Sequence, residues 1–429
     1  MFFFALAQSA LGTGAGYVAL LLLAYERFES PWAISFILIA DLVPAMLLGP
    51  LFGALADRWS RKWCTVAGDV LRVVAFAGVA LVDSFFLTSV FALLAGIGTA
   101  AFTPAALAAL PSVVDDERRV PATSSMYGAV ADLGFTVGPA IAAGLLVISG
   151  PETIMVVNAV SFAVSAALLA SLRFGASPER PATGRPSLSL DIREGLRTSF
   201  RIRPIRLLLL GSGSALFCAG LFNVSELFYA ERHLGTTDAG FGVLVAFFGG
   251  GFIVGSLRGS TGGTPRLLKR RYLQGLAAVG LSLVAAALAS SLPVAAITFA
   301  FAGFGNGLLL VYERHLIQAT VPDALVGRVF GVKDALTAWA FAAAFLAGGA
   351  ALASVEVQDL LLVAGAVAFV VFAVSALALR NEWDEDEGPV VGGRDGTLSD
   401  GRASLDGSAD VASGDGVALG EHGADVVGR

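Results

Sequence analysis

The stretch GALADRWSRK, Gly53 to Lys62, separates two long apolar segments and guides the interpretation of the whole chain. It places one carboxylate, Asp57, among the cations Arg58, Arg61 and Lys62. A carboxylate at the end of an apolar helix is partly desolvated, so it needs a nearby Arg or the positive N-terminal end of another helix. Such a cluster can latch two helical bundles and release them when the protein changes state. The alternative is a basic turn that only fixes membrane topology.

The composition on either side of this loop is that of a membrane protein. Hydrophobic residues make up 56% of the 429 residues, charged residues make up 14%, and the mean hydropathy is +0.77. A soluble domain has roughly 25% charged residues. The two cysteines, Cys64 and Cys218, lie far apart and have no metal or redox spacing. These features exclude a soluble enzyme, and they predict neither a metal site nor a cofactor.

Apolar runs of the length that a membrane helix needs, about 20 residues, recur along the chain up to residue 380. The first begins at the N-terminus and continues to Tyr25, which predicts a spanning helix rather than a signal peptide. The sequence therefore predicts an all-α membrane protein with twelve transmembrane helices. The predicted spans are 3–25, 32–55, 63–83, 86–108, 122–148, 152–172, 206–229, 238–258, 272–290, 293–313, 329–353 and 359–379.

The cations between these spans predict the orientation of the chain. Up to residue 380, one set of loops holds twenty-two Lys and Arg residues, and the opposite set holds only Arg27 and Arg232. Cytoplasmic loops of membrane proteins carry the excess of Lys and Arg. Both termini are therefore predicted to be cytoplasmic, and the alternation supports an even number of spans.

The longest interior break divides the predicted spans into two sets of six. The sequence predicts an N-terminal bundle at 1–172, a cytoplasmic linker at 173–205, a C-terminal bundle at 206–380 and a disordered acidic tail at 381–429. Within the linker, Leu190, Ile192, Leu196 and Phe200 alternate with Arg residues, which is typical of a basic amphipathic helix at an anionic membrane surface. The halves also share an acid followed by Arg-Val before an apolar helix, at Arg119-Val120 and Arg328-Val329.

The string GALADRWSRK resembles the first signature of the major facilitator superfamily, G-x-L-A-D-R-x-G-R-K. Every position agrees except Ser60, where the family has Gly. The resemblance implies the major facilitator fold, a monomer, and a conformational latch formed by Gly53, Asp57, Arg58, Arg61 and Lys62. The corresponding loop of the second half, GSLRGSTGGTPRLLKRR, keeps the cations but lacks the Asp.

A second resemblance lies in the fifth predicted span. The stretch GFTVGPAIAAG is similar to the exporter signature of this superfamily, with Gly134, Gly138 and Pro139 at its Gly-x-x-x-Gly-Pro positions. Gly and Pro there bend the helix and allow close backbone approach. Ser125 replaces an upstream Gly, and Ala142-Ala143 replaces a closing Gly pair. The element favours export, although the Arg that proton-coupled exporters of this family carry in the fourth span is absent at 86–108.

Four acids fall inside predicted spans and are candidate proton or substrate sites: Asp41, Asp132, Glu226 and Glu313. A carboxylate at the bilayer centre costs at least ~2.5 kcal/mol, so such acids are commonly functional. The family fold places the seventh and tenth spans at the cavity, which favours Glu226 and Glu313 as ligands of a cationic substrate or a proton. Asp132 can pair with Arg72, or Arg72 can be neutralised by Asp69 on its own helix.

The sequence thus predicts a bacterial inner-membrane exporter of amphipathic small molecules, working by alternating access and coupled to protons. The substrate is expected between the halves near the membrane midplane. Its partners are the substrate, protons and the lipid bilayer, with no nucleic acid. The chain contains no P-loop (G-x-x-x-x-G-K-[ST]), which excludes ATP hydrolysis by that motif. The alternatives are a nutrient importer of the same fold, and a non-transporting sensor or scaffold that signals through the linker and tail.

Overall fold

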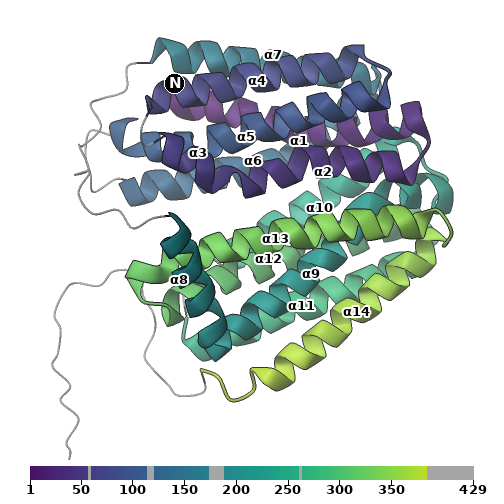
Figure 1. Cartoon of the computed structure of the whole chain (residues 1–429). Helices are drawn as coiled ribbons and strands as arrows, with labels where there is room; N and C mark the ends of the chain where they lie inside the picture. Colours follow the sequence, from purple (N-terminus) through teal and green to yellow (C-terminus); the bar gives the residue numbers. More distant parts are fainter. Residues whose placement is uncertain (57–58, 114–119, 173–187, 260–262, 384–429) are drawn as a thin grey trace, which may run out of the picture. The chain divides into compact units, whose positions relative to one another are not determined.

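The computed structural model describes residues 1–56, 59–113, 120–172, 188–259 and 263–383. All secondary-structure elements in these ranges are helices (Figure 1). The residues in these ranges belong to one compact unit. The first group of helices is α1 (Phe2–Phe28), α2 (Pro31–Leu47), α3 (Gly49–Ala56), α4 (Arg61–Leu81), α5 (Phe85–Val113), α6 (Val120–Leu146) and α7 (Pro151–Ser171).

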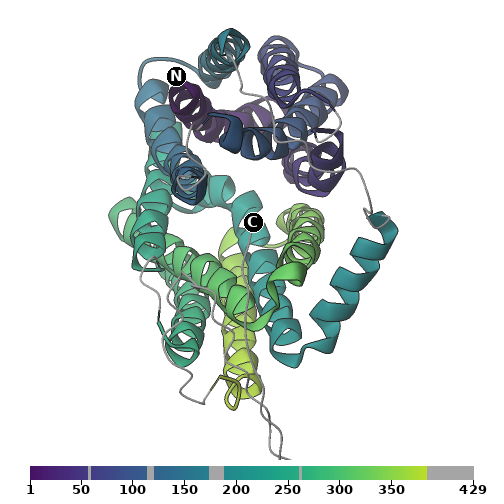
Figure 2. The ribbon, with the colours of Figure 1, turned by 90° about the vertical axis from the view of Figure 1, so that its left-hand side faces the viewer.

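The second group of helices begins after residues 173–187, which lie outside the described ranges. It comprises α8 (Leu188–Arg201), α9 (Arg203–Phe228), which continues as the π-helix η2 (Tyr229–His233), α10 (Asp238–Gly259), α11 (Pro265–Leu288), α12 (Leu292–Thr320), α13 (Asp323–Leu352) and α14 (Val357–Ala378). In Figure 2, α1–α7 and α9–α14 form two groups, and α8 lies at the side of the second group. Helix α8 packs against α13 and α9.

The prediction of all-helical structure is confirmed, but the second predicted span differs from the structure. It is not one continuous helix, because α2 ends at Leu47 and α3 begins at Gly49. Pro44 lies inside α2, and Pro50 lies in the first turn of α3. Proline lacks the backbone N–H that a continuous helix uses, and its ring clashes with the preceding turn. The two prolines therefore explain the bend at Leu48.

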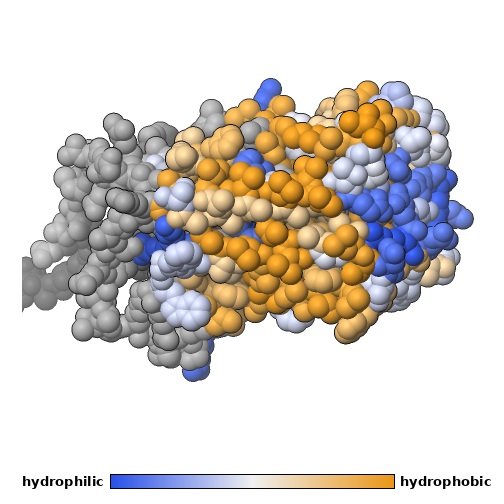
Figure 3. All heavy atoms as spheres, turned by 90° about the horizontal axis from the view of Figure 1, so that it is seen from above, coloured by the Kyte–Doolittle hydropathy of each residue, from blue (hydrophilic) through white to orange (hydrophobic). Residues whose placement is uncertain are grey.

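Ten helices of the described residues are long and apolar enough to cross a membrane, and two shorter apolar helices lie at Pro31–Leu47 and Val137–Leu146. On the face shown in Figure 3, hydrophobic residues cover the middle of the described part of the molecule, and hydrophilic residues gather toward one end. Lipid is the natural solvent for such a surface. The chain is therefore a multi-pass membrane protein.

The two groups repeat the same helix contacts at one constant offset along the chain. A Cβ atom added at Gly96 would lie 2.2 Å from the carbonyl oxygen of Asp41, and one added at Gly303 would lie 1.8 Å from that of Phe248. The step in residue number from Gly96 to Gly303 equals the step from Asp41 to Phe248. Helix α12 begins and ends at this same offset from the beginning and end of α5. The second group is therefore a structural repeat of the first.

The two groups contact each other through α2 with α13 and through α6 with α10. A Cβ at Gly349 would lie 2.4 Å from the Ser35 hydroxyl, and a Cβ at Gly242 would lie 2.5 Å from the Ala143 methyl carbon. The rings of Tyr25 and Phe228 meet edge to face, with centroids 5.2 Å apart. All three contacts lie near helix ends that adjoin the short loops at 29–30, 147–150, 234–237 and 353–356.

Helices α10 and α12 pack backbone against backbone. A substitution that adds one methyl group at this contact therefore tests how close the two helices are. A Cβ at Gly251 would lie 1.8 Å from the carbonyl oxygen of Ala300, whereas a Cβ at the neighbouring Gly250 meets nothing within 4 Å. We expect Gly251→Ala to lower the stability of the purified protein by about 1–3 kcal/mol, the usual cost of overpacking. Gly250→Ala is the matched control, and it gains the helix propensity of Ala without a clash. Unfolding in detergent measures both, and equal stability of the two variants would contradict the packing.

Candidate functional site

A cavity of about 480 Å³ lies among helices of both groups. Most of its wall is apolar, with Leu42 and Pro139 from the first group and Phe222, Phe248 and Phe341 from the second. A few polar side chains interrupt this wall: Tyr17, Asn223, Glu226, Asn306, Lys333, Asp334 and Thr337. An apolar cavity with a few placed polar groups is the usual form of a small-molecule site.

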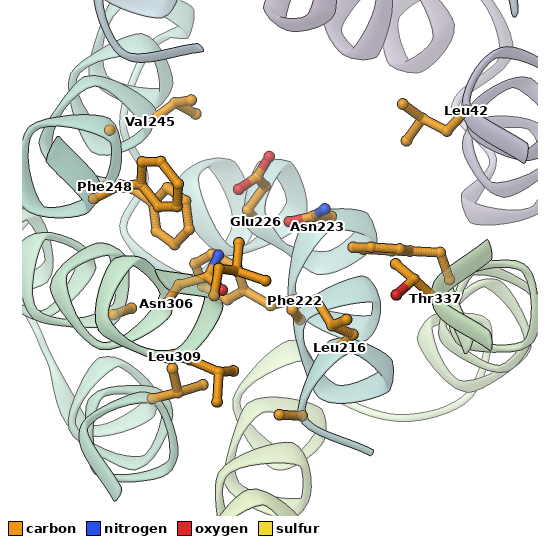
Figure 4. A pocket seen from close by; sticks show the side chains of 18 of the residues that line it. Leu42, Leu216, Phe222, Asn223, Glu226, Val245, Phe248, Asn306, Leu309 and Thr337 are labelled. Atoms are coloured by element: carbon orange, nitrogen blue, oxygen red, sulfur yellow. The ribbon is translucent and has the colours of Figure 1, made fainter. Parts of the chain in front are cut away.

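Glu226 is the acidic group on the α9 side of this cavity. Its side chain and that of Asn223 project toward the open space between the helices (Figure 4). Glu226 is 5% exposed, and the hydroxyl of Tyr17 in α1 donates a hydrogen bond of 3.2 Å to its Oε1. In the described part of the chain, no Lys or Arg forms an ion pair with Glu226. The arrangement leaves an acid in apolar surroundings that can bind a cation or a proton.

Glu313 is also buried, but it is not among the residues that line the cavity. It is fully shielded from solvent, and the Ser212 hydroxyl of α9 donates a hydrogen bond to its Oε1. Its Oε2 has no hydrogen-bond partner among the described residues. Lys333 of α13, which does line the cavity, interacts with Glu313 electrostatically. Glu313 is therefore placed behind the cavity wall.

The remaining two candidate acids lie in the first group. Asp41 is half-buried where α2 crosses α5, and it is not itself a lining residue, although its neighbour Leu42 is. Arg72 of α4 interacts with Asp41 electrostatically. Asp132 belongs to α6, but its side chain lies outside the described residues. The four predicted acids are thus not gathered into one cluster by the part of the chain that the structure describes.

Arg72 forms an ion pair with Asp69, one turn away on α4, as one of the two sequence hypotheses predicted. Both side chains are buried, at 4% and 0% exposure. The guanidinium carbon of Arg72 lies 4.2 Å from the ring centroids of both Phe102 in α5 and Phe162 in α7. Cation–π contact of this kind stabilises a desolvated cation. Sequence reasoning missed the two rings, because they belong to other helices and no spacing connects them to Arg72.

The described residues of the first signature bind the ends of other helices. Arg61 donates a hydrogen bond of 2.7 Å to the carbonyl oxygen of Ala108, near the end of α5. Lys62 donates one of 2.8 Å to the carbonyl oxygen of Leu172, directly after α7. Cations are stabilised at helix C-termini, where carbonyl groups lack partners. A Cβ at Gly53 would lie 3.6 Å from Pro104, and Asp57 and Arg58 lie outside the described residues.

Lys269 makes the same contact in the second group, although its loop has lost most of the signature. Its ammonium nitrogen lies 3.2 Å from the carbonyl oxygen of Leu379, directly after α14. The step from Lys62 to Lys269 equals the step from Leu172 to Leu379, and both equal the offset of the internal repeat. Each group therefore fixes the end of its last helix with a lysine from the corresponding helix, α4 or α11. The sequence by itself shows only that this loop keeps its cations.

The exporter-type element of α6 packs against α1. A Cβ at Gly134 would lie 2.5 Å from the carbonyl oxygen of Ala10, and a Cβ at Gly138 would lie 2.7 Å from the Cα of Gly14. Pro139 then faces the cavity as one of its lining residues. The two glycines bring the helices together, and the proline that follows contributes to the wall.

A multi-pass helical fold with a mostly apolar cavity between two groups of helices defines the class of membrane transporters. The profile of the Major Facilitator Superfamily matches residues 2–331. The chain belongs to this superfamily, and the resemblance found in the sequence is confirmed.

Relatives and solved structures agree with this assignment. The multidrug efflux pump Tap of Mycobacterium tuberculosis is 29% identical over 349 residues, which cover 78% of this chain and 82% of Tap. The MFS-type transporter YfiS of Bacillus subtilis is 25% identical over 381 residues, covering 87% and 91%. The nucleoside transporter NupG shares the fold with a TM-score of 0.71 at 11% identity, covering 88% of this chain and 100% of that structure.

The Arg72–Asp69 pair generates a stability prediction. Arg72→Met leaves Asp69 buried without its cation, which costs about 3–5 kcal/mol for a buried pair. Asp69→Asn leaves Arg72 in the same position with its charge uncompensated. The double variant removes both charges, so we expect it to be more stable than Arg72→Met alone. Unfolding in detergent gives the free energies for this double-mutant cycle. If the double variant loses as much stability as the two single variants together, the two charges do not depend on each other.

Proposed function

We propose that this chain is a secondary active transporter that exports amphipathic small molecules, drugs or metabolites, from bacterial cells. The observation that carries the proposal is Glu226 on the wall of an apolar cavity to which both groups of helices contribute. The apolar wall suits the hydrophobic part of such a molecule, and the carboxylate suits a cationic end. The name of the Tap relatives, multidrug efflux pump, and the Gly-Pro element of α6 support export.

Transport would proceed by alternating access. The contacts between the groups that involve Tyr25, Ser35 and Ala143 gather at one end of the helices. A rocking motion that opens this end and closes the other would expose the cavity to each side in turn. The latch formed by Gly53, Asp57, Arg58, Arg61 and Lys62 would hold the opposite end. Arg61 and Lys62 already bind the ends of α5 and α7, so the latch would act on α4, α5 and α7 together.

The arrangement in the membrane follows from the same proposal. We place the protein in the bacterial inner membrane as a monomer with twelve spans and with both termini in the cytoplasm. The twelve-span count requires α2 with α3, and α6, to cross the bilayer in addition to the ten helices that meet the length and hydropathy requirement. The proposed division is a first bundle at 1–172, a linker at 173–205, a second bundle at 206–380 and a tail at 381–429.

Protons are the proposed coupling ion, and Asp41, Asp132, Glu226 and Glu313 are the candidate carriers. Glu226 and Glu313 each accept a hydrogen bond from a hydroxyl group and form no ion pair within the described residues. Isolated charges in apolar surroundings are costly, and a proton removes the charge. A proton and a cationic substrate would therefore compete for Glu226, which is the simplest basis for exchange of one for the other.

The proposal is tested by efflux of a lipophilic cationic dye from energised cells. We expect efflux that an uncoupler abolishes, and that Asp57→Asn abolishes at equal expression because the latch is lost. Glu226→Gln keeps the shape of the side chain but removes its charge, so we expect at least a roughly tenfold loss of cation efflux, which corresponds to about 1.4 kcal/mol. A neutral dye should be affected much less.

The matched control is Glu152→Gln, which removes an acid that is outside the cavity and 48% exposed, paired with Arg27. This variant should export the cationic dye as the unmodified protein does. If dye accumulates in cells faster with the protein than without it, the direction is uptake and the importer alternative is correct. If neither dye moves, and removal of 381–429 still changes the cell's response, the sensor or scaffold alternative is correct.

A further inference from the structure

The chain beyond α14 is held against the ends of three other helices. We call residues Leu379–Trp383 the C-terminal turn. Lys269 of α11 lies 3.2 Å from the carbonyl oxygens of Leu379 and Arg380 and 2.6 Å from that of Glu382. Lys269 is only 6% exposed. The C-terminal turn includes the first three residues of the predicted tail, Asn381–Trp383.

The last residue of the turn adds a second attachment. The indole nitrogen of Trp383 donates a hydrogen bond of 3.1 Å to the hydroxyl of Thr320, at the end of α12. The backbone of Trp383 has a φ of 56°, in the left-handed region that non-glycine residues rarely adopt. A bulky residue in this conformation indicates that the surrounding contacts fix it. The position and the backbone conformation of Trp383 are therefore fixed by its contacts.

The C-terminal turn also forms an ion pair with an exposed arginine. The Oε1 of Glu382 lies 3.2 Å from a guanidinium nitrogen of Arg203, the first residue of α9. Arg201 and Arg206 are near it in the chain, and both are exposed. We call Arg201, Arg203 and Arg206 the arginine face. The positive end of the α9 dipole adds to the charge of these side chains.

The sequence immediately beyond the turn is complementary to this face. Four consecutive acids, Asp384–Glu387, follow Trp383, and they lie outside the described residues. Four extended residues span up to about 13–14 Å, so the acids start close to the ion pair that Glu382 already makes. We propose that the acidic run Asp384–Glu387 is the ligand of the arginine face and extends the Glu382–Arg203 contact over the junction of α8 and α9.

The junction between α8 and α9 is where such a contact matters. The chain turns at Ile202 between the two helices. At its other side, α8 is attached to α13 by an ion pair of 2.6 Å between Glu194 and Arg328. Helix α8 is also the described part of the link between the two groups of helices. A tail bound at Arg201 and Arg206 would fix the position of this link relative to α9.

The rival occupant of the arginine face is an anionic lipid surface. Leu196 and Phe200 of α8 are 43% and 42% exposed, and basic amphipathic helices bind such surfaces. The acidic run is favoured because Glu382 already occupies Arg203 and because the four acids follow it directly in the chain. Their local concentration at the face is set by a link of a few residues, which favours an intramolecular contact.

Limited digestion with trypsin tests the proposal in the full-length protein in a zwitterionic detergent. The readout is the rate of cleavage after Arg201, measured by mass spectrometry. The test variant converts the run to amides (Asp384→Asn, Glu385→Gln, Asp386→Asn and Glu387→Gln). The matched control removes four acids farther along the tail (Asp395→Asn, Asp400→Asn, Asp406→Asn and Asp410→Asn). We expect cleavage after Arg201 to be about five- to tenfold faster in the test variant alone, because bound segments are protected from proteolysis.

Salt and lipid provide the deciding comparisons. High salt, about 1 M, screens exposed charges over a few ångströms, so it should raise the cleavage rate of the unmodified protein to that of the test variant. Equal rates of cleavage after Arg201 in the test and control variants at low salt would overturn the proposal. A rate in the unmodified protein as fast as that in the test variant would overturn it too. If anionic vesicles protect Arg201 equally in the unmodified protein and the test variant, while zwitterionic vesicles protect neither, the face binds lipid and the proposal is wrong.

Discussion

The constraint on which the rest of this structure depends is the cost of a polar group without a partner in hydrocarbon. Each unsatisfied backbone group costs several kcal/mol there, and the helices of this chain satisfy these groups by hydrogen bonds within each helix. Without a hydrophobic force between helices in lipid, tight packing has to come from small residues. The contacts at Gly96, Gly251 and Gly303 show this directly, since a single added carbon would meet a neighbouring carbonyl oxygen.

The same constraint decides where the charged side chains lie. Arg72 is buried with Asp69 and lies between two aromatic rings, so its charge is balanced inside the first group. Lys62 and Lys269 are placed where helices end and carbonyl oxygens need donors. Glu226 differs from all of these, because it borders a cavity and accepts one hydrogen bond from Tyr17. A charge that the protein does not balance is available to a ligand.

Much of the fold was predictable from the sequence, because hydropathy and loop cations are local signals. Each predicted span except the second falls on one helix, and the break at Leu48 in the second could have been expected from Pro44 and Pro50. The candidate site was less predictable, because its contacts join helices that are distant in sequence. Tyr17 of α1 meets Glu226 of α9, and the position of Glu313 behind the wall depends on how α9 and α12 face each other. The docked end at Trp383 has no signal in composition.

The internal repeat distinguishes residues that pack the helices in both halves from residues that occur in only one half. At the offset that relates Lys62 to Lys269, Gly68 and Gly98 correspond to Gly275 and Gly305, and these pairs make matching close contacts. Three charged residues farther inside the helices do not repeat: Asp41, Arg72 and Glu313 correspond to Phe248, Val279 and Ala106. Two copies of one frame therefore carry different charged residues. A ligand that binds one arrangement of the two halves more tightly than another shifts the protein toward that arrangement.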